Sequence, residues 1–208
     1  MARTRATDFD MKRRAILSSA ARVFAEQGMD KASMSQIADR ADVSKSLLYH
    51  YYASKDALVF GIIHGHLTEL DAALEAADDQ GSEAPVRLRA LIHTVLEAYR
   101  DADSEHKVQL NGASALKPEQ QADIHTLERR IVERFARVLG EINPDLATGS
   151  RKLLKPMTMS LFGMLNWVYL WFREDGPVSR RDYADAATVL FLRGVGGVTS
   201  ITNSSSSL

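Results

Sequence analysis

The chain has 208 residues, with 26 Lys and Arg against 27 Asp and Glu and no cysteine. This length suits one large or two small domains, and the absence of thiols excludes a disulfide framework, a thiolate metal site and a cysteine nucleophile. The first 55 residues carry ten basic and six acidic side chains, a net +4, whereas the remainder carries 16 and 21, a net −5. A basic N-terminal part followed by an acidic remainder indicates that the N-terminal part binds a polyanion.

The spacing of apolar residues predicts helices throughout the chain. The first ends at Gly28, the second is capped by Ser33 or Ser35, and the third is capped by Ser44. The predicted helices cover 8–27, 34–41, 45–51, 55–78, 86–99, 105–115, 118–142, 153–173 and 180–195. No segment has the alternation of a strand, so we predict an all-α fold. The Ser-rich segment 199–208 is predicted to be disordered.

The most apolar part of the chain, 157–172, has 16 residues and includes Thr158, Ser160 and Asn166. It is short for a membrane span, and the basic N-terminus lacks the apolar stretch of a secretory signal. We therefore expect no membrane partner and read 153–173 as a buried helix.

Two short predicted helices joined by a tight turn lie within 32–57, which is the layout of a helix-turn-helix. Lys45 and Ser46 begin the second of these helices, where side chains reach base edges in the major groove. Hydroxyl, imidazole, amide and ammonium groups nearby can hold phosphates. The residues expected to bind DNA are Ser35, Gln36, Lys45, Ser46, Tyr49, His50, Tyr52 and Lys55. A plain helical hairpin with surface tyrosines is the alternative, but three tyrosines within four positions argue against it.

This segment resembles the DNA-binding domain of TetR-family transcriptional regulators over 11–60. The resemblance rests on FAEQG at the end of the first helix and on SMSQIADRADVSKSLLYHYYASKDAL after it. The family usually has Gly where this chain has Asp42, which tolerates a left-handed backbone better than most residues. Ser46 replaces another frequent Gly.

The resemblance implies a DNA-binding domain at 8–54 and a helical ligand-binding and dimerisation domain at 55–198. It also implies a cytoplasmic, nucleoid-associated bacterial repressor that binds a palindromic operator as a homodimer. A dimer is expected on physical grounds too, because one recognition helix reads only a few base pairs and two half-sites lie about 34–36 Å apart or a multiple of that distance.

Large side chains in the apolar helix are our candidates for an effector pocket, since such pockets are mostly apolar with few polar groups. The candidates are Phe162, Met164, Asn166, Trp167, Tyr169 and Trp171. Each of them also fits the hydrophobic core or a dimer interface. Asn166 differs from the others because a buried amide needs partners.

The C-terminal half, including LNWVYLWFREDGPVSRRDYADAATVLFLRGV, resembles TetR-like regulators that sense acyl-CoA thioesters. That resemblance implies a small hydrophobic effector, an acyl-CoA or aryl-CoA thioester. A regulator of a different hydrophobic ligand, such as a drug, and a ligand-free helical interaction module are the alternatives.

An enzyme is the main rival class, but the chain has no HExxH, Walker A or GxSxG motif. His64 and His66 are two residues apart and point to different faces of a helix, which makes a poor metal pair. Asp78 and Asp79 are predicted in a solvent-exposed loop. We expect no catalytic residue, no metal and no cofactor.

Overall fold

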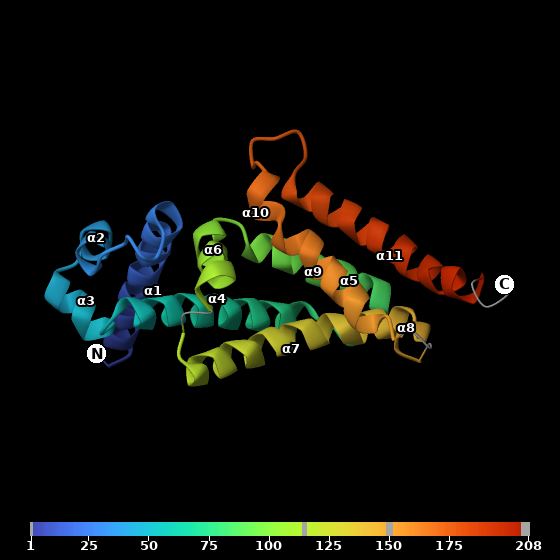
Figure 1. Cartoon of the computed structure of the whole chain (residues 1–208), viewed down its shortest axis with the longest axis horizontal. Helices are drawn as coiled ribbons and strands as arrows, with labels where there is room; N and C mark the ends of the chain where they lie inside the picture. Colours follow the sequence, from blue (N-terminus) through green and yellow to red (C-terminus); the bar gives the residue numbers. More distant parts are fainter. Residues whose placement is uncertain (1, 114–115, 149–151, 205–208) are drawn as a thin grey trace. The chain divides into compact units, whose positions relative to one another are not determined.

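The computed structural model describes residues 2–113, 116–148 and 152–204, and every regular element within these ranges is helical (Figure 1). The all-α prediction is therefore confirmed for the described part of the chain. The helices are α1 Ala2–Gln27, α2 Met34–Arg40, α3 Lys45–Tyr51, α4 Lys55–Ala77, α5 Ala84–Ala98, α6 Asp103–Gly112, α7 Pro118–Ile142, α8 Asp145–Thr148, α9 Leu154–Asn166, α10 Val168–Trp171 and α11 Arg180–Ser204.

The helix limits differ from prediction mainly where no apolar stripe marks them. Helix α1 begins at Ala2 rather than at residue 8, and Ala and Arg, which are frequent in this segment, have high helix propensity. The predicted helix 153–173 is broken at Trp167 into α9 and α10. Helix α11 continues to Ser204, so 199–204 is helical where disorder was expected. Residues 205–208, and 114–115 of the predicted sixth helix, lie outside the described residues.

The chain folds into two compact units, and the functional division at 54/55 stays a prediction. Unit 1 comprises residues 1–69 and 101–127, and unit 2 comprises 70–100 and 128–208. Helices α4 and α7 each contribute residues to both units. Helix α4 is long and apolar enough to cross a membrane by composition, yet half of its most apolar window is buried, as in a core helix of a globular protein.

In unit 1, α1 packs against α2 and α6. The apolar side chains that fill this core are fully or nearly fully buried, and they include Ile16, Ala20, Phe24, Ile37, Leu48, Leu58 and Ile62. Gly112 marks a close approach, because a Cβ there would lie 2.9 Å from Val59 Cγ1 and 3.1 Å from Met29 Sδ. The glycine therefore lets α6 pack tightly beside α4 and the turn that follows α1.

In unit 2, α11 packs along α5, and α9 contacts both. The buried apolar face of α5 consists of Leu88, Leu91, Ile92, Val95 and Leu96. Phe135 of α7 and Phe162 of α9 meet edge to face, with ring centroids 4.9 Å apart. These contacts make one hydrophobic core from segments far apart in the sequence.

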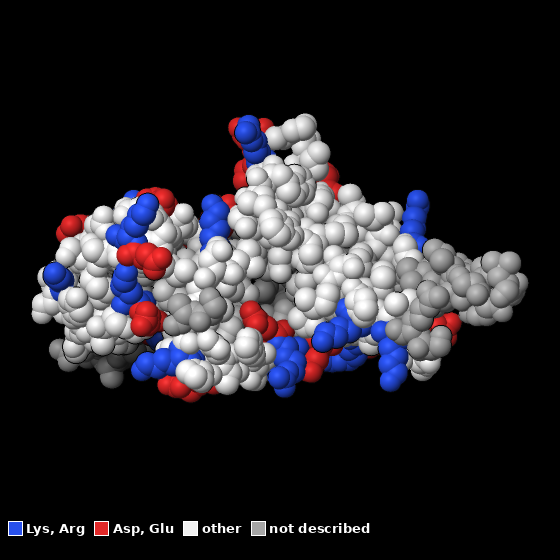
Figure 2. Space-filling model, viewed as in Figure 1, with Lys and Arg blue, Asp and Glu red and all other residues white. Residues whose placement is uncertain are grey.

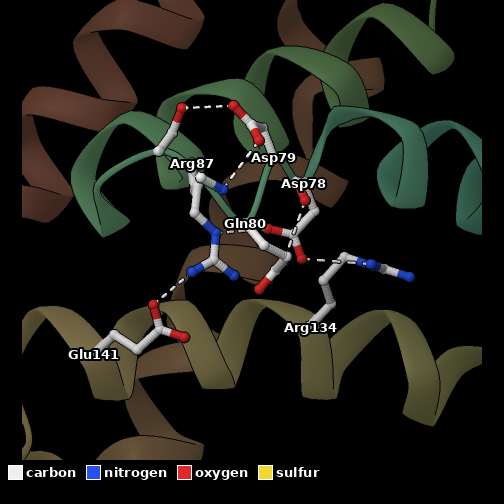
Figure 3. A network of polar contacts seen from close by, with 8 residues as sticks. Asp78, Asp79, Gln80, Arg87, Arg134 and Glu141 are labelled. Atoms are coloured by element: carbon white, nitrogen blue, oxygen red, sulfur yellow. Dashed lines mark hydrogen bonds and ion pairs between the residues drawn. The ribbon is translucent and has the colours of Figure 1, made fainter.

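A network of charged side chains is buried where α4, α5 and α7 of unit 2 meet (Figure 3). Arg87 Nε donates to Asp78 Oδ1 at 2.8 Å, and Arg134 Nη1 lies 3.4 Å from Asp78 Oδ2. Arg87 also pairs with Glu141. The expectation that Asp78 is solvent-exposed is wrong, because its side chain is only 1% exposed.

Burial alone raises the pKa of Asp78, but the hydrogen bonds and positive charges of Arg87 and Arg134 outweigh it and hold the pKa below its ordinary value. Arg134 also pairs with Asp71 on α4, at 3.5 Å. Asp78 therefore carries its charge inside the unit, and the network fixes the end of α4 to α5 and α7.

Candidate nucleic-acid interface

The start of α2 is fixed by a reciprocal cap. Ser33 Oγ accepts a hydrogen bond from the Gln36 backbone N–H at 3.2 Å, and Gln36 Oε1 accepts one from the Ser33 N–H at 2.8 Å. Gln36 Nε2 also donates to Gln27 Oε1 at 3.0 Å. Ser33 is thus the cap, while Ser35 lies half-buried in the first turn and Gln36 lies exposed with its amide held in place.

The turn between α2 and α3 needs a left-handed residue, and Asp42 supplies it with a φ of 52°. Val43 N–H then donates back to the Ala38 carbonyl at 3.0 Å. Ser44 begins α3 by accepting a hydrogen bond from Leu47 N–H at 3.1 Å. The expectation that Asp42 preserves the turn is confirmed, and Leu48, which is fully buried, anchors α3 from below.

One face of α3 is open to solvent and carries four of the predicted DNA-binding side chains. Lys45, Ser46, Tyr49 and His50 are all exposed, and their spacing places them on one side of the helix. Tyr51 points elsewhere, since its ring stacks on Phe9 of α1 at a centroid distance of 4.8 Å. The result is a small surface that combines ammonium, hydroxyl, phenol and imidazole groups.

Tyr52 and Lys55 have other contacts. Tyr52 is only 7% exposed, and its hydroxyl accepts a hydrogen bond from Arg13 Nε at 3.0 Å. Burial raises the pKa of this phenol, against the opposing effect of Arg13. Lys55 Nζ donates to the carbonyls of Met29 and Asp30 at 2.8 and 3.2 Å.

These contacts correct the expected roles. Tyr52 belongs to the core of unit 1 and positions the end of α3, because the residue is buried and Arg13 holds its hydroxyl. Lys55 ties the start of α4 to the turn after α1, and only one of its three ammonium donors remains for a phosphate. No local pattern marks Phe9 or Arg13 as supports of α3, since their partners lie about 40 residues further along the chain.

The six candidate pocket residues of unit 2 differ in their exposure. Trp167 and Trp171 are 58% and 54% exposed, whereas Phe162 is buried in the core. Asn166 Oδ1 accepts a hydrogen bond from the Tyr99 hydroxyl at 2.9 Å, which gives the amide the partner it was expected to need. Met164 and Tyr169 are half-buried. The helix breaks at Trp167, and both tryptophans lie exposed, which the apolar periodicity did not predict.

Capped helices around a left-handed turn, with a polar face on the second helix, define a helix-turn-helix protein. Comparison with family models agrees with this geometry. Residues 16–62 match the model of bacterial regulatory proteins of the tetR family, and residues 81–195 match a tetracyclin repressor-like C-terminal domain. The second match alone covers more than half of the chain. The chain belongs to the TetR family, and it is a ligand-responsive, DNA-binding transcriptional regulator.

Known relatives extend over nearly the whole chain. A TetR-family transcriptional regulator from Bordetella parapertussis is 32% identical and superimposes with a TM-score of 0.80, covering 86% of this chain and 93% of that one. The transcriptional activator FasR of Mycolicibacterium smegmatis is 27% identical over 89% of this chain and 83% of its own length. The structure of AibR with isovaleryl coenzyme A and operator DNA, 24% identical with a TM-score of 0.72 over 86% and 97% of the two chains, shares the fold.

Proposed function

We propose that this protein is a repressor that binds a palindromic operator as a homodimer in the bacterial cytoplasm and is released by an acyl-CoA or aryl-CoA thioester. The exposed face of α3 is the observation that supports DNA binding. It presents Lys45, Ser46, Tyr49 and His50 together on a helix whose start and preceding turn are fixed by hydrogen bonds.

Lys45 and Ser46 lie at the N-terminal end of α3, and we assign them to base edges. Tyr49 and His50, one turn later, donate to phosphates on the flank. Gln36 and Ser35 serve the same purpose from the first turn of α2, and Lys55 does so with its remaining donor. Tyr52 acts indirectly, by holding the end of α3.

An apolar outer face of unit 2 supports the homodimer. Exposed residues recur every three or four positions along α9 and α10, at Met159, Gly163, Trp167 and Leu170. On α11, the exposed residues at helical spacing are Ala186, Leu190, Gly194 and Gly197, which are mostly small. Figure 2 shows few charged side chains on the face that α9 and α11 turn to the viewer. Apolar faces of this kind mark interfaces.

The choice of effector is supported by two relatives and by the residues near Asn166. The relatives include AibR, whose structure contains isovaleryl coenzyme A, and the repressor KstR2 of Mycobacterium tuberculosis, described as a ketosteroid regulator. In this chain, Phe162, Met164 and the Asn166–Tyr99 pair offer an apolar surface with one polar pair. Another hydrophobic ligand, such as a drug, is the second candidate.

Helix α4 provides the route for the signal, because it begins at Lys55 in unit 1 and ends in the buried ion network of unit 2. A ligand that shifts the end of α4 would change the spacing of the two recognition helices of a dimer. A coupling free energy of about 1–3 kcal/mol is enough for a useful switch.

The test begins with selection of an operator from random duplex DNA, followed by anisotropy titration of the operator and of unrelated DNA. We expect Lys45→Ala to change the preferred sequence, with little loss on unrelated DNA. Equal losses on both DNAs would contradict base reading by Lys45. Isovaleryl-CoA and hexanoyl-CoA are then added to the complex, with free coenzyme A as the control. A complex that persists at saturating thioester would refute the proposed effector class.

A further inference from the structure

Two adjoining surface hollows lie between α5 and α11 of unit 2, and both are lined by His93. The larger, of about 610 Å³, is lined by side chains of α5 and α11 that include Pro85, Val86, Ala90, Val189 and Leu192. The smaller, of about 400 Å³, is lined by Leu96, Arg100, Arg180 and Arg181, among others. Together they form the α5/α11 groove, which is apolar at one end and cationic at the other.

The cationic end is built on a buried arginine. Arg180 is only 8% exposed, its Nη1 donates to the Leu96 carbonyl at 3.0 Å, and its Nε donates to Glu174 at 2.7 Å. Its guanidinium also lies over the Phe172 ring, 4.9 Å from the centroid. Next to it, Arg181 is exposed and forms no ion pair within the described part of the chain. An anion reaching this end would meet an exposed guanidinium that is not held in an ion pair among the described residues, next to the carboxylate of Asp182.

The carboxylates of the groove are already engaged. Asp185 accepts hydrogen bonds from Arg89 Nε at 2.8 Å and from His93 Nε2 at 2.7 Å, which hold the pKa of Asp185 below its ordinary value. Glu97 pairs with Arg100 at 2.9 Å. Three of the four arginines that line the groove thus pair with carboxylates, Arg89 with Asp185, Arg100 with Glu97 and Arg180 with Glu174. Arg181 is the fourth, and it faces the ligand side of the groove as an exposed cation.

We propose that the α5/α11 groove binds an amphipathic anion: a linear alkyl chain that carries a carboxylate or phosphate head. The head pairs with Arg181 beside Arg100, and the chain lies over Val86, Ala90 and Val189. Helix α5 runs twelve residues from Val86 to its end at Ala98, about 18 Å of helix, and Arg100 lies just beyond, so the span calls for a long chain. Charge complementarity supports this occupant, because Arg181 is the exposed cation of the groove that the other lining residues leave for an anionic head.

The groove and the proposed dimer face lie on different sides of α11. Successive residues of a helix advance by about 100°, so Asp185, Val189 and Leu192 point about 110° away from Ala186, Leu190 and Gly197. None of the residues of the proposed dimer face lines the groove. This inference does not rest on the proposed operator, dimer or thioester effector.

The test is equilibrium dialysis of the full-length protein with radiolabelled tetradecanoate and with tetradecyl phosphate, below their micelle concentrations. The control ligand is tetradecyltrimethylammonium, which has the same chain and the opposite charge. The Arg181→Glu variant removes the head contact, and Val189→Asp places a charge at the apolar end, where the residue is 47% exposed. Arg137→Glu, on the exposed surface of α7, makes the same charge change outside the groove.

We expect both anions to bind and the ammonium to bind at least about tenfold more weakly. Arg181→Glu and Val189→Asp should each weaken anion binding about tenfold, with Arg137→Glu unchanged and operator affinity unchanged in all three. Tight binding of only one anion would identify the head group. Equal affinity for the ammonium, or unaltered binding by Arg181→Glu, would overturn the proposal. So would dissociation of the assembly by Val189→Asp without loss of anion binding, since the groove would then be an interface between copies of this chain.

Discussion

Arg87 and Asp78 form an ion pair inside unit 2, with Nε and Oδ1 2.8 Å apart and both side chains at most 4% exposed. A buried pair of this kind contributes little net stability, but removal of one partner leaves the other charge without compensation. The network includes Arg134 and Glu141 as further partners (Figure 3). The free energy of unfolding should therefore fall only when one partner of the network is removed.

We expect Asp78→Ala to lower the free energy of unfolding by about 3 kcal/mol, because two arginines then lose a buried counter-charge. Urea denaturation measures this loss. Glu133→Ala is the control, since Glu133 is an exposed acidic residue on α7 of the same unit. A paired Asp78→Leu and Arg87→Met change should recover much of the stability. Equal losses for Asp78→Ala and Glu133→Ala would show that the ion pair is not essential to the fold.

His66 predicts an acid-sensitive step in unit 1. Burial and, to a smaller extent, the charge of the nearby His106, at a centroid distance of 6.1 Å, together lower the pKa of His66 from its ordinary 6.5 to about 4. Between these two pH values the unfolded chain binds a proton that the folded chain does not bind. Stability therefore falls as the pH drops from about 6.5 to about 4, by about 3 kcal/mol in all.

The variant His66→Leu should flatten the dependence of the unfolding free energy on pH across this window, relative to the parent protein. His125→Gln is the matched control, because His125 lies exposed on α7. Denaturation curves at a series of pH values provide the measurement. An unchanged slope in His66→Leu would contradict the assignment of this step to His66.

The left-handed backbone of Asp42 should make stability sensitive to the shape of the side chain at this position. Its φ of 52° suits Gly and is tolerated by Asp, but a β-branched side chain is strained there. We expect Asp42→Val to lower thermal stability by about 1–2 kcal/mol and to weaken operator binding, because α3 loses its fixed approach. Asp42→Gly should stay within about 0.5 kcal/mol of the parent. Equal stability of the Val and Gly variants would show that this turn relaxes to another conformation.

Local sequence signals explain which parts of the fold were predictable. Ser33, Asp42 and Ser44 determine the limits of α2 and α3 through contacts within a few residues, so these helices lie almost where they were predicted. The limits of α4 and α7 were predictable as well, because apolar residues at helical spacing are also a local signal. The exposed face of α3 then follows directly, because helical spacing decides which side chains share it.

Partners distant in the sequence explain the errors. Asp78 is buried because Arg87 and Arg134 come from two other helices, and a pair of acidic residues in a loop does not reveal them. Tyr52 turns inward to Arg13, which lies 39 residues away. The α5/α11 groove joins residues more than 80 positions apart, as the Arg180 bond to Leu96 illustrates. Each of these features depends on tertiary packing that periodicity does not encode.

Tyr49 and Tyr52 should separate DNA contact from support of the fold. Tyr52→Phe removes the hydrogen bond to Arg13 and is expected to cost about 1 kcal/mol of stability, with little change in DNA affinity. Tyr49→Phe removes an exposed hydroxyl, and we expect unchanged stability with about fivefold weaker binding to operator and unrelated DNA alike. Thermal denaturation and anisotropy titration give the two readouts. A reversal of the two patterns would return Tyr52 to the DNA interface.

Trp167 tests the proposed dimer, because it is 58% exposed on the apolar face of α9 and α10. Trp167→Glu would bury a charge in that interface, so we expect a folded monomer by light scattering and circular dichroism. Operator affinity should then fall at least about 100-fold, since the two half-sites are no longer held by one particle. Val86→Glu is the control, because Val86 is 55% exposed and lies on α5 in the α5/α11 groove. If Trp167→Glu remains dimeric, or if Val86→Glu alone becomes monomeric, the copies associate through a different face.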